Sequence, residues 1–240
     1  MEAHAEVPGR LRVIESRLEG ACRRAGRQPT EVTLIGASKV QPIEALRAAF
    51  DAGLRVFGEN RVQEAAGKKP QLPSEIDWHL IGPLQSNKVR PAVEIFSTLH
   101  AIDRLKIARA VARVAAETGA VRRGFLEVNL AAEATKHGFS PQQVNGELLS
   151  QLAELSHLRV IGLMAIPPFG GEPEASRRWF RHLRELGDQV KESGLLPHWE
   201  GALSMGMSSD FEIAIEEGAT HVRVGTELFG PRVRGGEVSP

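Results

Sequence analysis

The sequence predicts a single closed barrel of eight parallel β-strands, each followed by a helix. Short apolar segments alternate with helical patterns from residue 32 almost to the end of the chain. Such alternation implies a parallel sheet, because parallel strands need long crossover connections. About eight such units occupy roughly 200 residues, which suits a (β/α)8 barrel. Since no Pro-, Gly- or Ser-rich linker divides the chain, we expect one domain over residues 1–232 and a mobile polar tail over 233–240.

The predicted strands are short apolar runs at residues 32–39, 55–59, 77–82, 96–102, 124–130, 158–166, 198–205 and 220–230. An extra helix precedes the first strand, because Leu11, Ile14 and Leu18 recur every three or four residues. Gly26 stands where a left-handed C-terminal cap would end this helix. Cys22 lies on its apolar side and is expected to be an inert core residue.

Capping signals define several helices between the strands. Pro42 and Gly53 are placed to begin and end the helix after the first strand. We expect Asp103 to cap the helix after the fourth strand, and Ser140 and Gln143 to form a capping box later in the chain. An open doubly wound sheet is the alternative architecture, but the first strand–turn–helix lacks the GxGxxG fingerprint.

Composition and charge exclude several classes of function. Thirty basic residues balance thirty acidic ones without forming a basic stripe, so nucleic-acid binding is not expected. The eight histidines show no metal-binding spacing, and His79 and His100 are expected to be hydrogen-bonded interior residues. Without an apolar run long enough for a membrane or a secretory signal, and with one cysteine, the chain is expected to be cytoplasmic.

Lys39 is the first candidate functional residue. It follows the apolar run "LIGAS" at the end of the first strand, and active sites of such barrels lie at the C-terminal ends of the strands. Partial desolvation there disfavours the charged form of an amine, which leaves a nucleophile able to form a Schiff base with a carbonyl compound. The alternative, a lysine that simply enters solvent at the end of a strand, is not excluded by this residue alone.

The segment after the seventh strand predicts a phosphate site. The chain leaves that strand through Gly206 and enters a helix whose start offers Ser208, Ser209 and Asp210 as caps, and Ser209 and Glu212 are spaced as a capping box. Unpaired backbone N–H groups at a helix start, with hydroxyls beside them, favour a phosphate. Ordinary capping is the alternative interpretation.

The eighth unit adds to this prediction. Gly225 permits close backbone approach and Thr226 contributes a hydroxyl, in one of the two loops that often hold phosphate in this fold. A lysine and a phosphate site together indicate pyridoxal 5′-phosphate (PLP), or a phosphorylated sugar in a lysine-dependent aldolase. Arg223 favours PLP because its guanidinium is placed to donate to the pyridine nitrogen. A permanent cation would keep that nitrogen unprotonated and weaken the ring as an electron sink. A surface ion pair is the alternative interpretation of this arginine.

The chain resembles the pyridoxal phosphate homeostasis protein family, once described as proline synthetase co-transcribed homologues. The resemblance spans nearly the whole chain, and its third segment is specific to the family. The segments are "ASKVQP" at 37–42, "FGENRVQE" at 57–64, "WHLIGPLQSNK" at 78–88, "KHGF" at 136–139, "GLMAI" at 162–166, "SMGMSSDFEIAI" at 204–215 and "RVGTELFG" at 223–230.

This resemblance implies the barrel of alanine racemase without that enzyme's second, β-rich domain, and PLP held as a Schiff base on Lys39. It implies that Asn60 lies near the ring and that Arg223 faces the pyridine nitrogen. Residues implied around the phosphate are Ser204, Met205, Ser208, Gly225 and Thr226. Four further residues of the family pattern receive no assigned contact: Gln85, Asn87, Lys88 and Lys136.

The sequence contains no tyrosine. Alanine racemase uses a tyrosine as the acid/base opposite its lysine, and Cys22 lies too far from any strand end to replace it. We therefore expect a non-catalytic protein that buffers PLP or delivers it to apo PLP-dependent enzymes, as the resemblance also implies. The alternatives are an amino-acid racemase with weak one-base activity and the aldolase. Without the second domain, a monomer is expected.

Overall fold

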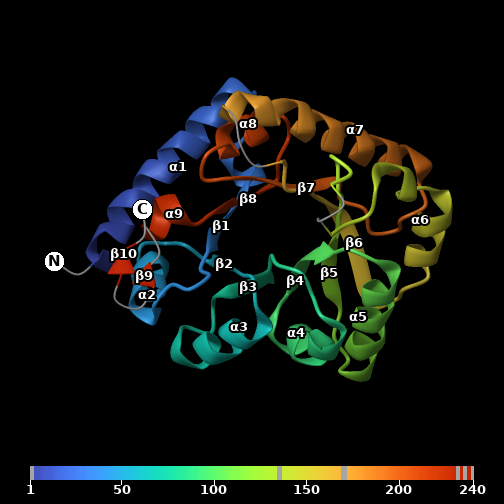
Figure 1. Cartoon of the computed structure of the whole chain (residues 1–240), viewed down its shortest axis with the longest axis horizontal. Helices are drawn as coiled ribbons and strands as arrows, with labels where there is room; N and C mark the ends of the chain where they lie inside the picture. The colour runs from blue at the N-terminus through green and yellow to red at the C-terminus, as the bar shows by residue number, and fades with distance from the viewer. Residues whose placement is uncertain (1–2, 134–136, 169–171, 231–232, 235–236, 239–240) are drawn as a thin grey trace.

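The strands of this chain close into a ring. The computed structural model describes residues 3–133, 137–168, 172–230, 233–234 and 237–238. Eight parallel strands follow one another in sequence order and β1 pairs with β8, while the helices lie outside the ring (Figure 1). The predicted (β/α)8 barrel is confirmed, and an open sheet is excluded. The strands are β1 Thr33–Ala37, β2 Val56–Glu59, β3 Asp77–Leu80, β4 Thr98–Ile102, β5 Arg122–Glu127, β6 Leu158–Met164, β7 Ala202–Met207 and β8 His221–Val224.

Helices fill the connections between the strands. The predicted segment 220–230 is divided, because β8 ends at Val224 and a short helix begins at Thr226. Gly53, with a φ of +117°, follows α2 as predicted. The helices are α1 Val7–Arg24, α2 Ile43–Asp51, α3 Val62–Lys68, α4 Val89–Ile95, α5 Leu105–Glu117, α6 Gly146–Ala153, α7 Arg177–Ser193, α8 Phe211–Glu216 and α9 Thr226–Phe229.

The predicted extra helix, α1, lies along α8 and α9 (Figure 1). Arg17 pairs with Glu212 at 2.7 Å and with Glu227 at 3.0 Å, so one cation joins α1 to both helices. Cys22 is fully buried in the apolar core beneath α1, and Gly26 follows the end of the helix with a φ of +66°. The predicted core position of Cys22 and the predicted cap at Gly26 are confirmed, and α1 covers the last two units of the barrel.

Two predicted helix caps are wrong. Arg104, not Asp103, precedes α5, and it is extended (φ −162°, ψ 151°), so Asp103 stands one residue too early to reach the helix amides and instead pairs with Arg104. Ser209 and Glu212 form no capping box on α8, because Asp210 occupies the N-cap position and the Glu212 carboxylate is drawn outward to α1. Asp210 is one of the three residues that the sequence offers as caps of this helix.

A third predicted cap forms, but on a different element. Ser140 and Gln143 make the expected capping box around a single 3-10 turn, Pro141–Gln143. The α-helix that follows begins later, at Gly146, where the side chain of Asn145 accepts from the first free amides.

The described residues form two apolar cores. The larger lies between the strands and the surrounding helices, whereas the smaller fills the barrel and contains Ala101, Phe125, Ile161, Met164 and Ala202. Imidazole rings complete this interior, since His100 stacks on Phe125 with ring centroids 4.4 Å apart and His221 meets the same ring edge-on at 5.0 Å. His79 and His100 are hydrogen-bonded to each other at 2.9 Å, which confirms the prediction for both.

The described part of the chain contains no helix long and apolar enough to cross a membrane. Near the C-terminus, β9 Val233–Arg234 and β10 Glu237–Val238 pair in antiparallel orientation. The rest of the predicted mobile tail, 235–236 and 239–240, lies outside the described residues, so its mobility remains a prediction.

Candidate functional site

A cavity of about 400 Å³ lies at the C-terminal ends of the strands, within the size range of small-molecule sites. Six of the eight predicted site residues line it: Lys39, Asn60, Ser208, Arg223, Gly225 and Thr226. Ser209, from the predicted phosphate loop, also lines the cavity, and five residues with no predicted site role complete the lining: Ala37, Gln41, Ile81, Ile166 and Met207. The structure therefore brings the lysine and both predicted phosphate loops to one cavity.

Lys39 lies in a tight turn directly after β1. Ser38 continues the strand ladder by donating its N–H to the Gly58 carbonyl at 2.9 Å, and Gln41 N–H closes the turn on the Ser38 carbonyl at 3.0 Å. Val40 takes a left-handed conformation, with a φ of +62°. This turn leaves Lys39 half-buried at the cavity wall rather than fully in solvent.

A buried polar network anchors that turn from beneath. The Lys68 ammonium donates to Glu59 Oε1 at 2.6 Å, to Glu64 Oε1 at 2.9 Å and to the Ser38 carbonyl at 2.7 Å. The Ser38 hydroxyl donates to Glu59 at 2.7 Å, and Val40 N–H donates to Glu64. Burial raises the pKa of the Glu59 carboxyl, and the hydrogen bonds from Lys68 and Ser38 oppose that shift. Strand β2 and helix α3 thus hold the lysine-bearing turn.

The two predicted phosphate loops are joined to each other. Gly225 N–H donates to the Ser208 hydroxyl oxygen at 3.3 Å, which links the turn after β8 to the loop after β7. Asp210 closes the β7 loop, because its carboxylate accepts from Met207 N–H at 2.7 Å while its own N–H donates to the Met207 carbonyl at 3.1 Å. Gly206, the last residue but one of β7, has a φ of +91°, a backbone conformation that favours glycine.

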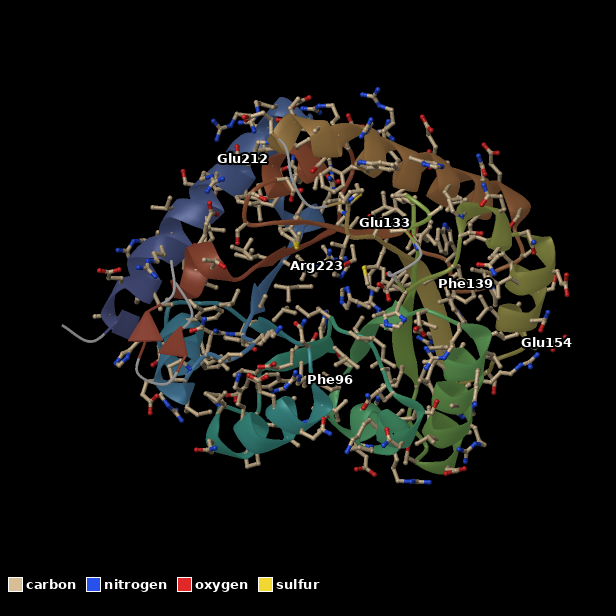
Figure 2. All side chains as sticks on the ribbon, viewed as in Figure 1. Phe96, Glu133, Phe139, Glu154, Glu212 and Arg223 are labelled. Carbon is tan, nitrogen blue, oxygen red and sulfur yellow. The ribbon has the colours of Figure 1, made fainter. Side chains whose placement is uncertain are left out.

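Arg223 is a buried cation near the centre of the ring (Figure 2). Its Nη1 donates to the Ser204 carbonyl at 3.0 Å and to the Ser204 hydroxyl at 2.6 Å, and its Nη2 donates to the Ala165 carbonyl at 3.1 Å. These bonds use three of the five guanidinium N–H donors. Burial lowers the Arg223 pKa to about 10, against the attraction of Asp210 and Glu127, so it remains a cation at neutral pH.

Two predicted site residues do not line the cavity. The Ser204 side chain is fully buried beneath it, where its hydroxyl contacts Arg223 and His100. Met205 points the other way and packs in the core between the strands and the helices. Successive residues of a strand face opposite sides of the sheet, so the side chains of Ser204 and Met205 cannot both reach the same cavity. Because neither residue lines the cavity, the lining gives no support for the direct cofactor contacts that the family resemblance implies for them.

The family-pattern residues without assigned contacts are distributed around the site. Gln85 and Lys88 line a second cavity of about 580 Å³, which shares Lys39 and Asn60 with the first. Asn87 is exposed. Lys136 lies outside the described residues.

The lining suits an aldehyde that carries a phosphate group. It offers the Lys39 amine, hydroxyls from two loops and a buried cation, and it contains no acidic residue among those described, so a phosphate meets no negative charge there. The side chains of Ala37, Ile81 and Ile166 provide apolar walls for a planar ring. These residue types are those needed to hold PLP, and no described group of three or more acidic, histidine or cysteine side chains is arranged for a metal.

Residues 24–233 match the family model described as "Alanine racemase, N-terminal domain". The pyridoxal phosphate homeostasis protein of Aquifex aeolicus (strain VF5) is 44% identical over 226 residues, which cover 93% of this chain and 97% of that protein. Its counterpart in Pseudomonas aeruginosa is 44% identical over 227 residues, covering 94% and 96% of the two chains.

A solved structure agrees with these sequence comparisons. PipY of Synechococcus elongatus PCC7942, with PLP bound, aligns with a TM-score of 0.82 and 38% identity, over 93% of this chain and 100% of that one. The resemblance found in the sequence motifs is confirmed, and this chain belongs to the pyridoxal phosphate homeostasis protein family, with the barrel of the alanine racemase N-terminal domain.

Proposed function

We propose that this protein binds PLP covalently on Lys39 and acts as a cytoplasmic buffer and carrier of the cofactor. The observation that carries the proposal is that Lys39, Arg223 and the hydroxyl-bearing loops after β7 and β8 share one cavity. The relative with PLP bound, PipY, aligns over 93% of the chain. The cavity chemistry and the family therefore support the same cofactor.

Each part of the lining has a distinct task in this proposal. When bound, PLP supplies an aldehyde to which the Lys39 amine adds. The hydroxyls of Ser208 and Thr226 donate to its phosphate, and the backbone at Gly225 allows close approach. Arg223 keeps two N–H donors that Ser204 and Ala165 do not use, and one of them donates to the pyridine nitrogen in this proposal.

The proposed role is non-catalytic because the cavity offers one proton-transferring side chain. Apart from Arg223, which remains a cation at neutral pH, Lys39 is the only ionisable side chain among the described lining residues. The chain contains no tyrosine, and Cys22 is buried in α1, outside the barrel. A site with one base and an open mouth suits release of the cofactor to an incoming amine, including an amine of an apo-enzyme.

The covalent bond is tested by adding PLP to the purified protein and following visible absorption. Lys39→Ala should lose the absorption band of the covalent adduct, whereas the control Lys88→Ala, from the adjoining cavity, should keep it. Borohydride reduction and mass analysis of the Lys39 peptide should show a pyridoxyl phosphate group. A sugar remnant on that peptide, or a band that persists in Lys39→Ala, would overturn the proposal.

The non-catalytic role is tested separately, against the racemase alternative. The PLP-loaded protein is incubated with amino acids in deuterated water, and Cα exchange is followed by NMR. We expect exchange far slower than on the order of 1 per second, the lower end of ordinary enzyme turnover. Exchange at or above that rate would identify an enzyme, even if the covalent bond to Lys39 were confirmed.

A further inference from the structure

A continuous line of hydrogen bonds crosses the barrel interior from Arg223 to Asp77. The Arg223 guanidinium donates to the Ser204 hydroxyl at 2.6 Å, and that hydroxyl lies 2.8 Å from His100 Nδ1. His100 Nε2 lies 2.9 Å from His79 Nδ1, and His79 Nε2 lies 3.2 Å from Asp77 Oδ2. Four strands, β8, β7, β4 and β3, each contribute at least one member.

The Asp77 carboxylate, at one end of this line, determines which atom donates in each hydrogen bond. Ionised Asp77 only accepts, so His79 carries its proton on Nε2 and, when neutral, offers Nδ1 as an acceptor. His100 then donates from Nε2 and accepts at Nδ1, which receives the Ser204 hydroxyl proton. The Ser204 oxygen is left with its lone pairs toward Arg223, which only donates. All four bonds therefore run in one direction.

We propose that Ser204, His100, His79 and Asp77 form a positioning relay that holds Arg223 in the orientation in which it meets the ring of the bound cofactor. The identity of the cofactor rests on the proposed function, whereas the relay is formed by the protein's own residues without any ligand. Residues that lie far below the cavity thereby influence cofactor binding without touching the cofactor.

Because the centre of the relay is buried, the loss of a hydrogen bond there would be costly in free energy. Ser204 and His100 are fully buried, so a hydroxyl without an acceptor or a ring nitrogen without a partner would carry a full desolvation penalty. Burial, with the nearby His79, His221, Arg223 and Arg123, holds the His100 pKa well below its usual range, so this ring is neutral. Without an acceptor on His100, the Ser204 hydroxyl proton must turn toward other oxygens, including those that Arg223 uses.

The far end of the relay reaches the opposite face of the barrel. Asp77 is the first residue of β3, and 47% of its side chain is exposed. Burial of the rest of the carboxyl would raise its pKa, but hydrogen bonds from His79 and Ser97 outweigh that effect and lower it. The relay therefore ends on an anion near solvent, which fixes the proton of His79 on Nε2.

Variants of His100 separate a positioning role from simple filling of the barrel. His100→Leu should weaken PLP binding about tenfold, as expected for the loss of one effective hydrogen bond. His100→Asn, whose amide oxygen can replace Nδ1 as the acceptor for Ser204, should recover most of that loss. The control Phe125→Leu alters packing beside the same ring and should bind PLP like the native protein. Equal PLP affinity of His100→Leu and the native protein would overturn the proposal.

A measurement on the cofactor-free native protein tests the relay independently of PLP. Nitrogen NMR of the imidazole rings, assigned with His79→Asn and His100→Asn, should show that the neutral form of each ring carries its proton on Nε2 and none on Nδ1. A proton on Nδ1 of either ring would refute the relay whatever the cofactor proves to be. If the relay tautomers are found but no covalent PLP forms, the proposed function fails and the relay remains.

Discussion

The ammonium group of Lys68 lies 2.6 Å from Oε1 of Glu59, directly beneath the turn that carries Lys39. Glu59 is fully buried and Lys68 nearly so, and the same ammonium donates to the backbone carbonyl of Ser38 at 2.7 Å. One buried cation thus neutralises a carboxylate and holds the last residue before Lys39. The placement of Lys39 depends on an ion pair whose two residues do not line the cavity.

Lys68→Met should destabilise the protein by about 3–5 kcal/mol, because it leaves the Glu59 charge buried without its partner. Urea unfolding followed by circular dichroism measures the change. The matched control is Lys69→Met, because Lys69 is exposed and its loss should change the unfolding free energy by no more than about 1 kcal/mol. Equal effects of the two variants would show that the pair contributes nothing specific.

A double variant tests the cause of that destabilisation. Replacing both members, Glu59→Met with Lys68→Met, removes the buried charge as well as its partner and should recover most of the lost unfolding free energy. If the double variant were less stable than Lys68→Met alone, packing rather than the unpaired charge would explain the loss.

The buried His221 makes stability depend on pH in the acid range. Burial, with the nearby His79, Arg123 and Arg223, lowers its pKa to about 3, against about 6.5 in the unfolded chain. Between these values the unfolded chain binds more protons, so the unfolding free energy falls as the pH decreases. The stability that depends on a neutral His221 is fully present above pH 6.5 and is lost progressively down to pH 3.

His221→Asn should remove this dependence. From pH 6.5 to pH 5 the native protein should lose roughly 1.5 kcal/mol more unfolding free energy than the variant, as measured by urea unfolding at each pH. His182→Asn, at an exposed position of α7, serves as the control and should follow the native protein. Parallel pH curves for the native protein and His221→Asn would refute the assignment.

The alternation of strands and helices was sufficient to predict the barrel, because a parallel sheet of this size has few other ways to cover both faces. Strand bounds were less accurate where polar residues begin a strand. Arg122 and Arg123 are the first two residues of β5, yet they lie outside the predicted segment 124–130. Their side chains are partly exposed at the start of the strand, so polar residues are tolerated there and the apolar pattern begins later.

The site was predicted only as far as its residues carry recognisable chemistry. Lys39, Ser208 and Arg223 were found from their functional groups, whereas Ile81 and Ile166 were missed because an apolar wall of a cavity has the same sequence pattern as a core. The relay and the Lys68 network were also missed. His79 and His100 are 21 residues apart, and the parallel pairing of β3 with β4 brings their rings together.

A substitution at Gly162 would test how closely the backbones of β6 and β7 approach each other. A Cβ at this position would lie 1.8 Å from the Ala202 carbonyl oxygen, and backbone cannot move away as a flexible side chain does. Gly162→Ala should cost about 3 kcal/mol or more in unfolding free energy. Gly67→Ala is the matched control, because this exposed position in α3 has no atom within 4 Å of the added methyl, and alanine should stabilise that helix by about 0.5–1 kcal/mol.

Gly82 offers a substitution that should act on the site more than on the fold. An added Cβ would lie 2.5 Å from the carbonyl oxygen of Asn60 and 2.8 Å from its Cα, and Asn60 lines the cavity beside Lys39. Gly82→Ala should therefore displace the Asn60 backbone and weaken PLP binding, on the order of tenfold for the loss of one polar contact. Titration with PLP and urea unfolding of the same variant measure the two effects.

Gly36→Ala distinguishes displacement of the site from general strain. Its Cβ would lie 2.6 Å from a terminal methyl of Leu54, a similar overlap, but on the helix side of β1 and against a flexible side chain. This control should lose stability and retain PLP affinity. The opposite ranking, with PLP binding weakened by Gly36→Ala and unchanged by Gly82→Ala, would mean that Asn60 is not a ligand of the cofactor and that the lysine-bearing strand alone governs the site.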